Sequence, residues 1–448
     1  MSFTVIIFIV VYVTGITMAL VKGAHWGFYI YQLVYFLNPE HRWWSSSLPG
    51  LPYPLITSIT LLLTYLIARK KYTYNNLSQL PYLKWAVLLI LSYCLAYYFA
   101  VQPDKHHKFT IYYFQMLVIV AIAYKVLDTQ QKLEWALLAY LVGAAYIGYE
   151  AYVVGRDEFG RVEGIGMVDA PESNGTAAAI APAISILIFY FWKGGIKLKL
   201  ATLIMGAFIV NGLVLINSRG AFLGAAISGI YFIFEMFKGK VQVKSQKLIA
   251  ATFIILGLAA MTVVVDESFM NRMNTLSEVE DESKSGSHRY RLWLIALEMS
   301  PEYPFGTGAF GYQHLSPQYV PEALFFNNQK KKAVHSIWMQ CLSEVGWIGF
   351  LSFIIIVLYC LRFLSKIKAK CVTENNTYNY YLAQALLSAF LGMLVASSFI
   401  DQFRVQIVYW MILFVTCYYN IIINNHAPGS SELTEDKGKQ AATPKRPT

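Results

Sequence analysis

Charged residues are scarce in this sequence of 448 residues, where they make up 14% of the chain and hydrophobic residues make up 56%. A soluble globular domain carries about 25% charged residues. The apolar residues come in runs of about twenty, the length that a helix needs to cross a bilayer. The composition therefore excludes a soluble protein with one aqueous core, and it predicts an all-α polytopic membrane protein.

Cysteine and recognisable cofactor motifs are also scarce. The five cysteines lie in or beside apolar segments, with neither a CxxC pair nor metal-ligand spacing; they are Cys94, Cys341, Cys360, Cys371 and Cys417. This pattern predicts no disulfide framework and no zinc site. The sequence has no Walker A loop, no GxGxxG fingerprint and no internal repeat. We therefore expect no use of ATP, no cofactor and no bound metal.

The net charge of +10 comes largely from lysines in short loops between apolar runs. This is the pattern of the positive-inside rule, so it does not indicate a nucleic-acid partner. The first apolar run carries no cation before Lys22. We therefore expect a retained membrane segment at the N-terminus and not a cleaved signal peptide.

Hydropathy predicts apolar helices along most of the chain, and the second of them is short. We therefore expect twelve or thirteen crossings, with two or three in the N-terminal region. The predicted segments are 3–21, 24–37, 53–68, 83–101, 108–127, 133–153, 176–192, 200–216, 220–237, 248–266, 346–364, 378–400 and 405–424.

Four dense basic loops predict the orientation: 68–72, 193–199, 238–247 and 362–370. An even number of crossings separates each pair, so all four fall on one side, which the positive-inside rule makes cytoplasmic. The expected transmembrane domain covers residues 1–424. Its long outer loop, 267–345, contains helical stretches such as 289–300. The tail 425–448 is polar and aperiodic, so we expect it to be disordered and cytoplasmic.

Arg219 lies in the turn "NSRG" between two apolar runs on the outer side. An arginine in hydrocarbon costs about 2.5–3.5 kcal/mol at a helix centre. It could snorkel to the interface. Positive charge is usually kept off the outer side, however, and the short turn leaves Arg219 little freedom. We therefore predict that it faces an anionic ligand.

Arg289 and Arg291 open the predicted outer helix 289–300. Two residues apart on a helix, their side chains point about 200° apart. Arg289 shares a face with Trp293 and Ala296, so we expect Arg289, and not Arg291, to face the site. The alternative is that Arg289 pairs with the acidic run 278–282.

His335 precedes the next apolar helix, and the turn 301–312 is rich in glycine, proline and aromatic residues. His335 could be an interfacial histidine with a structural hydrogen bond. Its unperturbed pKa also suits proton transfer near neutral pH. Gly306 and Gly308 indicate a positive φ or the close approach of another group.

Together, these residues predict a site for a phosphorylated lipid at the outer membrane surface. The planar fork of arginine binds phosphate oxygens in a bidentate manner. No cluster of metal ligands accompanies the arginines. The charge of a departing pyrophosphate would therefore be stabilised by arginine and not by a divalent cation.

Four motifs in this order carry a family resemblance: "SRGAFLG", "SHRYRLW", "PFGTGAFGY" and "HSIWMQCLSEVGWIG". Over roughly residues 170–365 the chain resembles the O-antigen ligase and polymerase superfamily. The stretch 31–44 is also similar to a subgroup of O-glycosylation ligases of exopolysaccharide systems.

The resemblance implies a glycosyltransferase of the GT-C type in the bacterial inner (cytoplasmic) membrane, with its active site facing the periplasm. Its donor would be a glycan on undecaprenyl pyrophosphate. Its acceptor would be a hydroxyl of a lipid core, a protein or a glycan. Transfer would need no metal, and membrane lipid would surround the enzyme.

The resemblance also implies roles for particular residues. Arg219 and Arg289 would bind the pyrophosphate, with Arg291 in reserve, and His335 would be the general base. Family members often have Asn after that histidine, where this chain has Ser336, which puts the local hydrogen bonding in question. Supporting residues would be Ser218, Asn174, Gly306 and Gly308. Asn174, in a further similar stretch at 163–177, could instead be only a helix cap.

Two other functions stay open at this point. A polymerase of the same superfamily would use a second lipid-linked chain as its acceptor, and its donor chemistry would be the same. A flippase or exporter would more often place ionisable residues at mid-membrane on several helices, or carry inverted repeats with broken helices. The sequence shows neither pattern.

Overall fold

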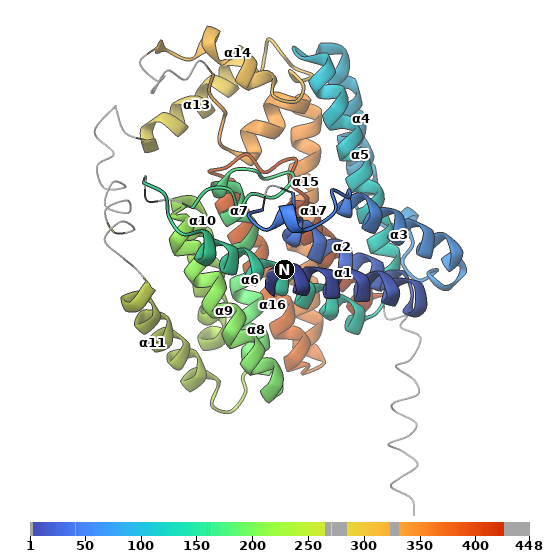
Figure 1. Cartoon of the computed structure of the whole chain (residues 1–448), viewed down its shortest axis with the longest axis vertical. Coiled ribbons are helices and arrows are strands. Elements are labelled where there is room, and N and C mark those ends of the chain that lie inside the picture. The colour runs from blue at the N-terminus through green and yellow to red at the C-terminus, as the bar shows by residue number, and fades with distance from the viewer. Residues whose placement is uncertain are drawn as a thin grey trace, which may run out of the picture.

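The computed structural model describes residues 3–40, 42–158, 160, 162–264, 270, 285–322 and 331–424 (Figure 1). Within these residues the regular structure is helical. The one extended contact there is an isolated bridge between Met167 and Ala170. The predicted all-α class is confirmed. The tail 425–448 and the acidic run 278–282 lie outside the described residues.

The helices follow one another with short connections over most of the chain. Their bounds are α1 Phe3–Lys22, α2 Ala24–Leu37, α3 Tyr53–Ile67, α4 Leu83–Leu95, α5 Pro103–Val126, α6 Gln130–Val154, α7 Ser173–Ile180, α8 Ala183–Lys193, α9 Ile196–Ile216, α10 Arg219–Lys238, α11 Gln246–Val264, α13 Ser285–Met299, α14 Gly311–Tyr319, α15 Ile337–Thr373, α16 Thr377–Ser397 and α17 Gln406–Ile423.

Nine of the described helical segments are long and apolar enough to cross a membrane, and three shorter apolar helices accompany them. The chain is therefore a multi-pass membrane protein. Each predicted apolar segment falls on helix within the described residues, but several boundaries differ from expectation; α15, for example, ends at Thr373 and not at 364. The segment predicted at 176–192 is two helices, α7 and α8, which meet at Pro182. Helix α15 begins at Ile337, and the non-helical backbone of Gly346 divides it into two parts. The predicted start at 346 coincides with this break, and the part before it was not among the predicted segments.

Glycines let the central helices approach closely. A Cβ on Gly224 of α10 would lie 2.4 Å from the Gly392 carbonyl oxygen of α16. A Cβ on Gly148 of α6 would lie 2.0 Å from the Phe208 carbonyl oxygen of α9. Small residues at such contacts allow backbones to pack without side chains between them. The α10–α16 contact fixes the position of Arg219, at the start of α10, relative to the connection that follows α16.

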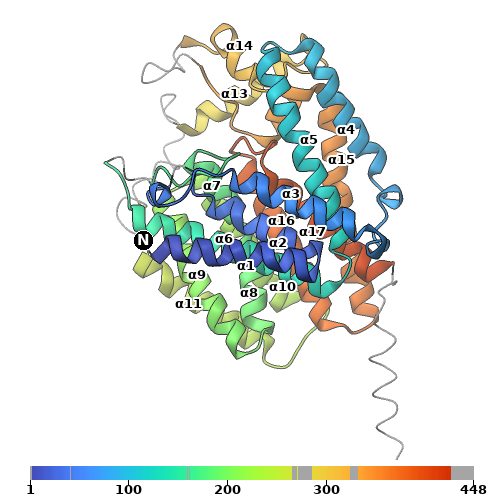
Figure 2. The same cartoon turned by 45° about the vertical axis from the view of Figure 1, so that its right-hand side comes forward.

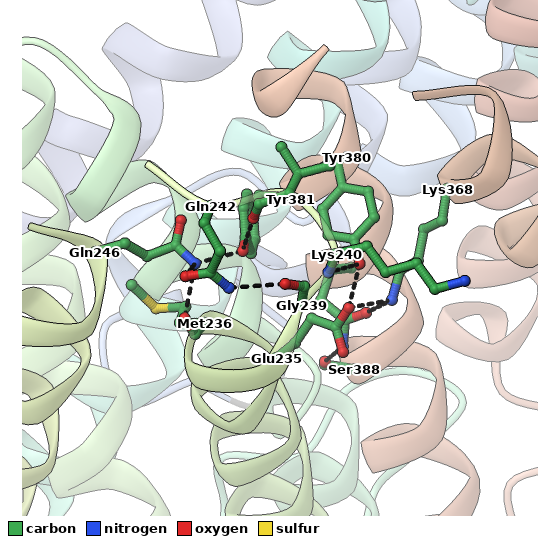
Figure 3. Close-up of polar contacts among 12 residues, drawn as sticks. Glu235, Met236, Gly239, Lys240, Gln242, Gln246, Lys368, Tyr380, Tyr381 and Ser388 are labelled. Carbon is green, nitrogen blue, oxygen red and sulfur yellow. Dashed lines mark hydrogen bonds and ion pairs between the residues drawn. The ribbon is translucent and has the colours of Figure 1, made fainter. Parts of the chain in front are cut away.

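A polar network joins two of the basic loops, 238–247 and 362–370 (Figure 3). Glu235 of α10 accepts a hydrogen bond from Lys368 Nζ of α15 at 2.8 Å, and a second from the Tyr380 hydroxyl. Tyr380 also accepts the Lys240 backbone N–H at 3.3 Å. The loop 238–247 therefore lies beside the end of α15 and the start of α16.

The other two basic loops reach the same end. Lys193 Nζ lies 5.8 Å from the centroid of the Tyr381 ring, one residue along α16 from the network. Beyond the loop 68–72, the Tyr74 hydroxyl donates to the Asn420 carbonyl at 3.3 Å. Lys370 donates to the nearby Ile422 carbonyl at 2.7 Å. This clustering agrees with the prediction that the four loops share one side, while α13 and α14 lie at the opposite end (Figure 1).

We predict that labelling with a membrane-impermeant thiol reagent will separate the two ends. Glu302→Cys, in the turn after α13, should react from outside the cell. Lys197→Cys, at the start of α9, should react only after the membrane is opened, because positive loops stay cytoplasmic. Four of the native cysteines are buried and Cys94 is half-buried, so a Cys94→Ser background suffices. Labelling of position 302 only from the cytoplasmic side would reverse the proposed orientation.

Candidate active site

A cavity of about 1230 Å³ is lined by residues of α13 and α14, among others. Its walls come from α5, α7, α13, the segment before α15 and the connection 398–405 between α16 and α17. Three of the predicted site residues line it: Asn174, Arg289 and His335. The other predicted residues are not among the lining residues within the described part of the chain; these are Arg219, Arg291, Ser218, Gly306 and Gly308.

His335 is held in a strained backbone conformation at the cavity wall. Its φ is 53°, in the left-handed region, which costs a non-glycine residue of the order of 1–3 kcal/mol. The next residue secures it, because the Ser336 backbone N–H donates to Asp401 Oδ1 at 3.0 Å. The contact uses the backbone, so serine in place of the family's asparagine leaves it intact. Strain of this kind often marks a functional position.

The electrostatic surroundings of His335 keep its imidazole neutral. Burial lowers its pKa, and the nearby cations Arg289 and Lys332 lower it further, to about 4. The pKa of His335 therefore lies well below the unperturbed value of histidine, because two cations and partial burial oppose protonation. At pH 7 the imidazole is unprotonated and can accept a proton.

Helix α13 presents Arg289 to the cavity. Arg289 is half-buried and lies close enough to His335 to lower its pKa, whereas Arg291 is exposed. On the Arg289 face, Ala296 is buried, and the Trp293 ring packs 5.9 Å from the Phe399 ring of the cavity wall. The helix therefore has the orientation that the spacing predicted.

The turn that carries Arg219 is as tight as predicted. Helix α9 ends at Ile216, Asn217 has a φ of 58° and caps it, and Ser218 precedes the first residue of α10. Arg156 secures the end of α9 by donating to the Val214 and Leu215 carbonyls at 2.8 and 3.2 Å. The turn is thus anchored on its α9 side, just before Asn217.

Arg219 is not among the described residues that line the cavity, but the start of α10 packs against the cavity wall. A Cβ on its neighbour Gly220 would be 3.0 Å from Phe399 Cβ, so the start of α10 packs against the residue that Trp293 also touches. A cation at a helix N-terminus opposes the helix dipole by about 0.3–1 kcal/mol. Such a terminus favours anions, so a phosphate beside Arg219 would offset that cost.

The turn 301–312 packs against the kink of α15. Thr307 donates its backbone N–H to the Ser343 carbonyl at 2.7 Å, and Gly308 donates to the Glu344 carbonyl at 3.1 Å. Gly306 has a φ of 88°, and a Cβ there would lie 2.4 Å from the same Glu344 carbonyl oxygen. Gly306 therefore meets both conditions that predicted glycine in this turn, a positive φ and the close approach of another group. The two glycines position α15 and do not line the cavity.

Three charged residues that the sequence analysis did not select also line the cavity: Glu344, Asp401 and Arg404. Arg404 Nε lies 3.3 Å from Glu344 Oε2. The Arg404 guanidinium carbon lies 3.9 and 4.6 Å from the ring centroids of Phe310 and Phe109. Arg404 Nη1 is buried and has no hydrogen-bond partner among the described residues, so it is available to a ligand.

Asp401 is a second titratable group beside His335. Burial raises its pKa, and the Glu344 carboxylate raises it further, to about 7, although the Ser336 N–H and Arg404 act in the opposite direction. Two signals could have identified this cluster in the sequence. Glu344 is an acid within an apolar helix, which usually marks function. "DQFR" at 401–404 places two charges between two apolar spans.

Asp169 and the start of α7 also line the cavity. Asp169 accepts the Tyr35 hydroxyl at 2.5 Å and the Gln406 backbone N–H at 2.9 Å, and burial raises its pKa to about 6. Glu172 is the N-cap residue of α7. Asn174 lies inside that helix, so it is not the cap that the alternative interpretation required.

Among the described residues, no three His, Cys, Asp or Glu side chains are grouped as a metal site. Residues 204–354 match the family model described as O-antigen ligase. The matched segment contains Arg219, Arg289, the turn 301–312, His335 and Glu344. No curated protein matches the chain. This match confirms the resemblance seen in the motifs for that segment, and it indicates a membrane enzyme of the glycosyltransferase type, a ligase or a polymerase.

Proposed function

We propose that this enzyme transfers a glycan from undecaprenyl pyrophosphate to an acceptor hydroxyl at the periplasmic face, in one inverting displacement without a metal ion. The observation that carries the proposal is the pairing of Arg289 and His335 on one cavity wall. A cation for phosphate and an unprotonated base for a hydroxyl are the two groups that this reaction needs.

The pyrophosphate is bound by Arg289 from α13 and by Arg219 from the start of α10. Both side chains offer a planar fork that fits phosphate oxygens. Arg291 lies on the exposed face of α13 and serves at most as a reserve cation. The negative charge that develops on the leaving group forms beside these arginines, and one such fixed donor typically contributes about 10²–10³ in rate.

The displacement itself uses His335 as the general base. An imidazole nitrogen takes the proton of the acceptor hydroxyl while the hydroxyl oxygen forms a bond to the anomeric carbon. The bond from that carbon to the phosphate oxygen breaks, and undecaprenyl pyrophosphate leaves with the electron pair. Attack from the face opposite the leaving group inverts the anomeric configuration.

The remaining polar groups of the cavity position the substrates. Asp401 holds the backbone at Ser336 and so fixes the imidazole of His335. Asp169 and Glu172 line the same cavity and can accept hydrogen bonds from sugar hydroxyls. Asn174, close to Glu172 on α7, can both donate and accept.

We predict that purified enzyme in liposomes will transfer an oligosaccharide from undecaprenyl pyrophosphate in the presence of EDTA. The reason is that arginine can supply the charge that a divalent cation would otherwise provide. NMR of the product linkage should show the anomeric configuration opposite to that of the donor. Retention of configuration would exclude a single displacement. A requirement for Mg²⁺ or Mn²⁺, with the protein still folded in EDTA, would exclude the arginine-only account.

The pH dependence of transfer distinguishes the contributions of Asp401 and His335. We expect transfer to increase as pH rises through about 7, where Asp401 becomes ionised and binds the Ser336 N–H most strongly. Asp401→Asn should remove this step, and the remaining acid limb should lie near pH 4, where His335 becomes protonated. The measurement is kcat/KM against pH for both proteins. A step near pH 6.5 that persists in Asp401→Asn would show a histidine with an ordinary pKa.

A further inference from the structure

A second cavity, of about 390 Å³, lies in the connection between α2 and α3, two helices that pack side by side (Figure 2). The residues that line it all come from the segment 38–54, and we call it the distal cavity. Pockets that bind small molecules occupy about 300–1,000 Å³. The distal cavity is therefore large enough to hold a ligand of its own.

The distal cavity adjoins the candidate active site. Glu40, Pro52 and Pro54 line both cavities. Asp169, in the wall of the active-site cavity, accepts the Tyr35 hydroxyl near the end of α2, just before the connection begins. A molecule bound in the active-site cavity can therefore extend past Glu40 into the distal cavity.

Buried polar contacts hold the connection between α2 and α3 in place. Trp44 is 2% exposed, and its Nε1 donates to Glu150 Oε1 and to the Tyr146 hydroxyl of α6, each at 3.2 Å. Arg42 is also buried and donates through Nη2 to the Phe36 carbonyl at 3.2 Å. Because these contacts tie an irregular segment to two helices, the connection presents a fixed surface to a ligand.

The lining of the distal cavity combines apolar surface with a few polar groups. Its apolar part is formed by four prolines, two leucines and a tyrosine. Asn38, Glu40 and Ser45 provide the polar part, and Asn38 Nδ2 donates to Glu40 Oε2 at 3.3 Å. No lysine or arginine of the described residues lines it, which makes it unsuited to a phosphate. Such a surface matches a sugar ring, which has apolar C–H faces and hydroxyl groups that both donate and accept.

A polar wall of the active-site cavity leads from the proposed donor site to the distal cavity. The first sugar of a donor held by Arg289 lies next to that side chain. From there Glu172, Asp169 and Glu40 line the cavity in turn, whereas the α5 wall is mostly apolar from residue 111 to residue 119. A glycan needs hydrogen-bond partners, so the further sugars of the donor follow the polar wall towards the distal cavity.

We propose that the distal cavity is a binding site for the sugars of the donor glycan beyond the first, so that the enzyme prefers a donor with an oligosaccharide to one with a single sugar. This inference rests on the proposed function for the identity of the donor. The presence of a saccharide site in the connection between α2 and α3 is a separate claim about binding.

Calorimetric titration of the full-length protein in nanodiscs tests the binding claim without any assay of transfer. The ligands are the lipid-linked glycan extracted from the host membrane and the same lipid after glycosidases have trimmed its glycan to the first sugar. Gly50→Trp fills the distal cavity, because Gly50 lines it and a Cβ there meets no atom within 4 Å. Gly195→Trp is the matched control, since Gly195 is equally open but caps α9 at a basic loop. Ser45→Trp is a second filling variant, which decides the matter if Gly50→Trp does not insert.

We expect the wild type to bind the untrimmed lipid about tenfold more tightly than the trimmed one, which corresponds to about 1.4 kcal/mol. Gly50→Trp and Ser45→Trp should bring this ratio close to one, and Gly195→Trp should keep it. Equal affinity of the wild type for the two lipids would overturn the proposal. A ratio that stays at the wild-type value in both filling variants would also overturn it, because the further sugars would then bind elsewhere.

Transfer assays then test whether the site belongs to the donor. With one fixed acceptor, the ratio of kcat/KM for the untrimmed donor to kcat/KM for the trimmed donor should fall about tenfold in Gly50→Trp and stay unchanged in Gly195→Trp. A loss in Gly50→Trp that follows the length of an acceptor glycan, and not the length of the donor glycan, would overturn the proposal. Absence of transfer from either lipid by the wild type would instead count against the proposed function, and the binding ratios would still decide whether the distal cavity holds sugars.

Discussion

Arg289→Ala is expected to lower the rate of transfer by about 10²–10³, the typical effect of removing one fixed donor to a developing negative charge. The protein should still fold and insert, because Arg289 is half-buried at the start of α13 and the apolar residues of that helix remain. Arg289→Lys should recover only part of the loss, because an ammonium group keeps the charge but lacks the planar fork. Single-turnover transfer with purified variants measures this directly.

Arg291→Ala is the matched control, because it removes an exposed arginine two residues away on the other face of the same helix. Its activity should stay close to that of the wild type. If the Arg291→Ala variant were inactive and the Arg289→Ala variant active, α13 would present its Arg291 face to the substrate during catalysis. Arg219→Ala should resemble Arg289→Ala, since its guanidinium is proposed to bind the same pyrophosphate.

Replacement of His335 is expected to cost about 10²–10⁴ in transfer, the usual contribution of a general base. The choice of substitution matters, because the backbone at this position is left-handed. Asparagine and glycine tolerate that conformation, whereas alanine and glutamine add strain to the loss of the imidazole. His335→Asn and His335→Gly therefore test the chemistry, and His335→Gln tests whether a hydrogen-bonding side chain alone is enough.

Added imidazole provides the control for His335→Gly. If the imidazole acts as a base, the free compound should restore part of the transfer activity of His335→Gly and none of that of Arg289→Ala. If His335 only anchors the start of α15, His335→Gln should keep most of its activity and imidazole should have no effect. That outcome would remove His335 from the mechanism and leave the arginines as the only chemistry.

Hydropathy predicted the helices because each crossing is set by local composition. The positions of Arg289 and Arg291 on α13 followed from helical geometry alone. The break between α7 and α8 was missed although Pro182 is a local signal for it, because proline disrupts a helix. The helical part of α15 before Gly346 did not follow from hydropathy, because it depends on packing. The residues before Gly346 are helical where the turn 301–312 covers them, a contact between segments far apart in the sequence.

Glu344 and the stretch 401–404 each carry a sequence signal, but their contact in the cavity depends on packing. Glu344 and Arg404 are sixty residues apart in the chain, and their contact exists only because α15 kinks and the connection after α16 returns beneath it. The pKa of His335 could not be predicted either, since it depends on burial and on Arg289 from another helix. The motifs identified candidate residues, whereas the side chains that they contact are known only from the structure.

The central claim is that the arginines bind the donor and His335 activates the acceptor. Binding of undecaprenyl-pyrophosphate-linked oligosaccharide and its single-turnover transfer, measured in parallel for Arg289→Ala and His335→Asn, test it most directly. We predict that Arg289→Ala will lose both donor binding and transfer, whereas His335→Asn will bind the donor like the wild type and fail to transfer it. A His335→Asn variant that transfers at the wild-type rate, or an Arg289→Ala variant that binds the donor unchanged, would contradict the account.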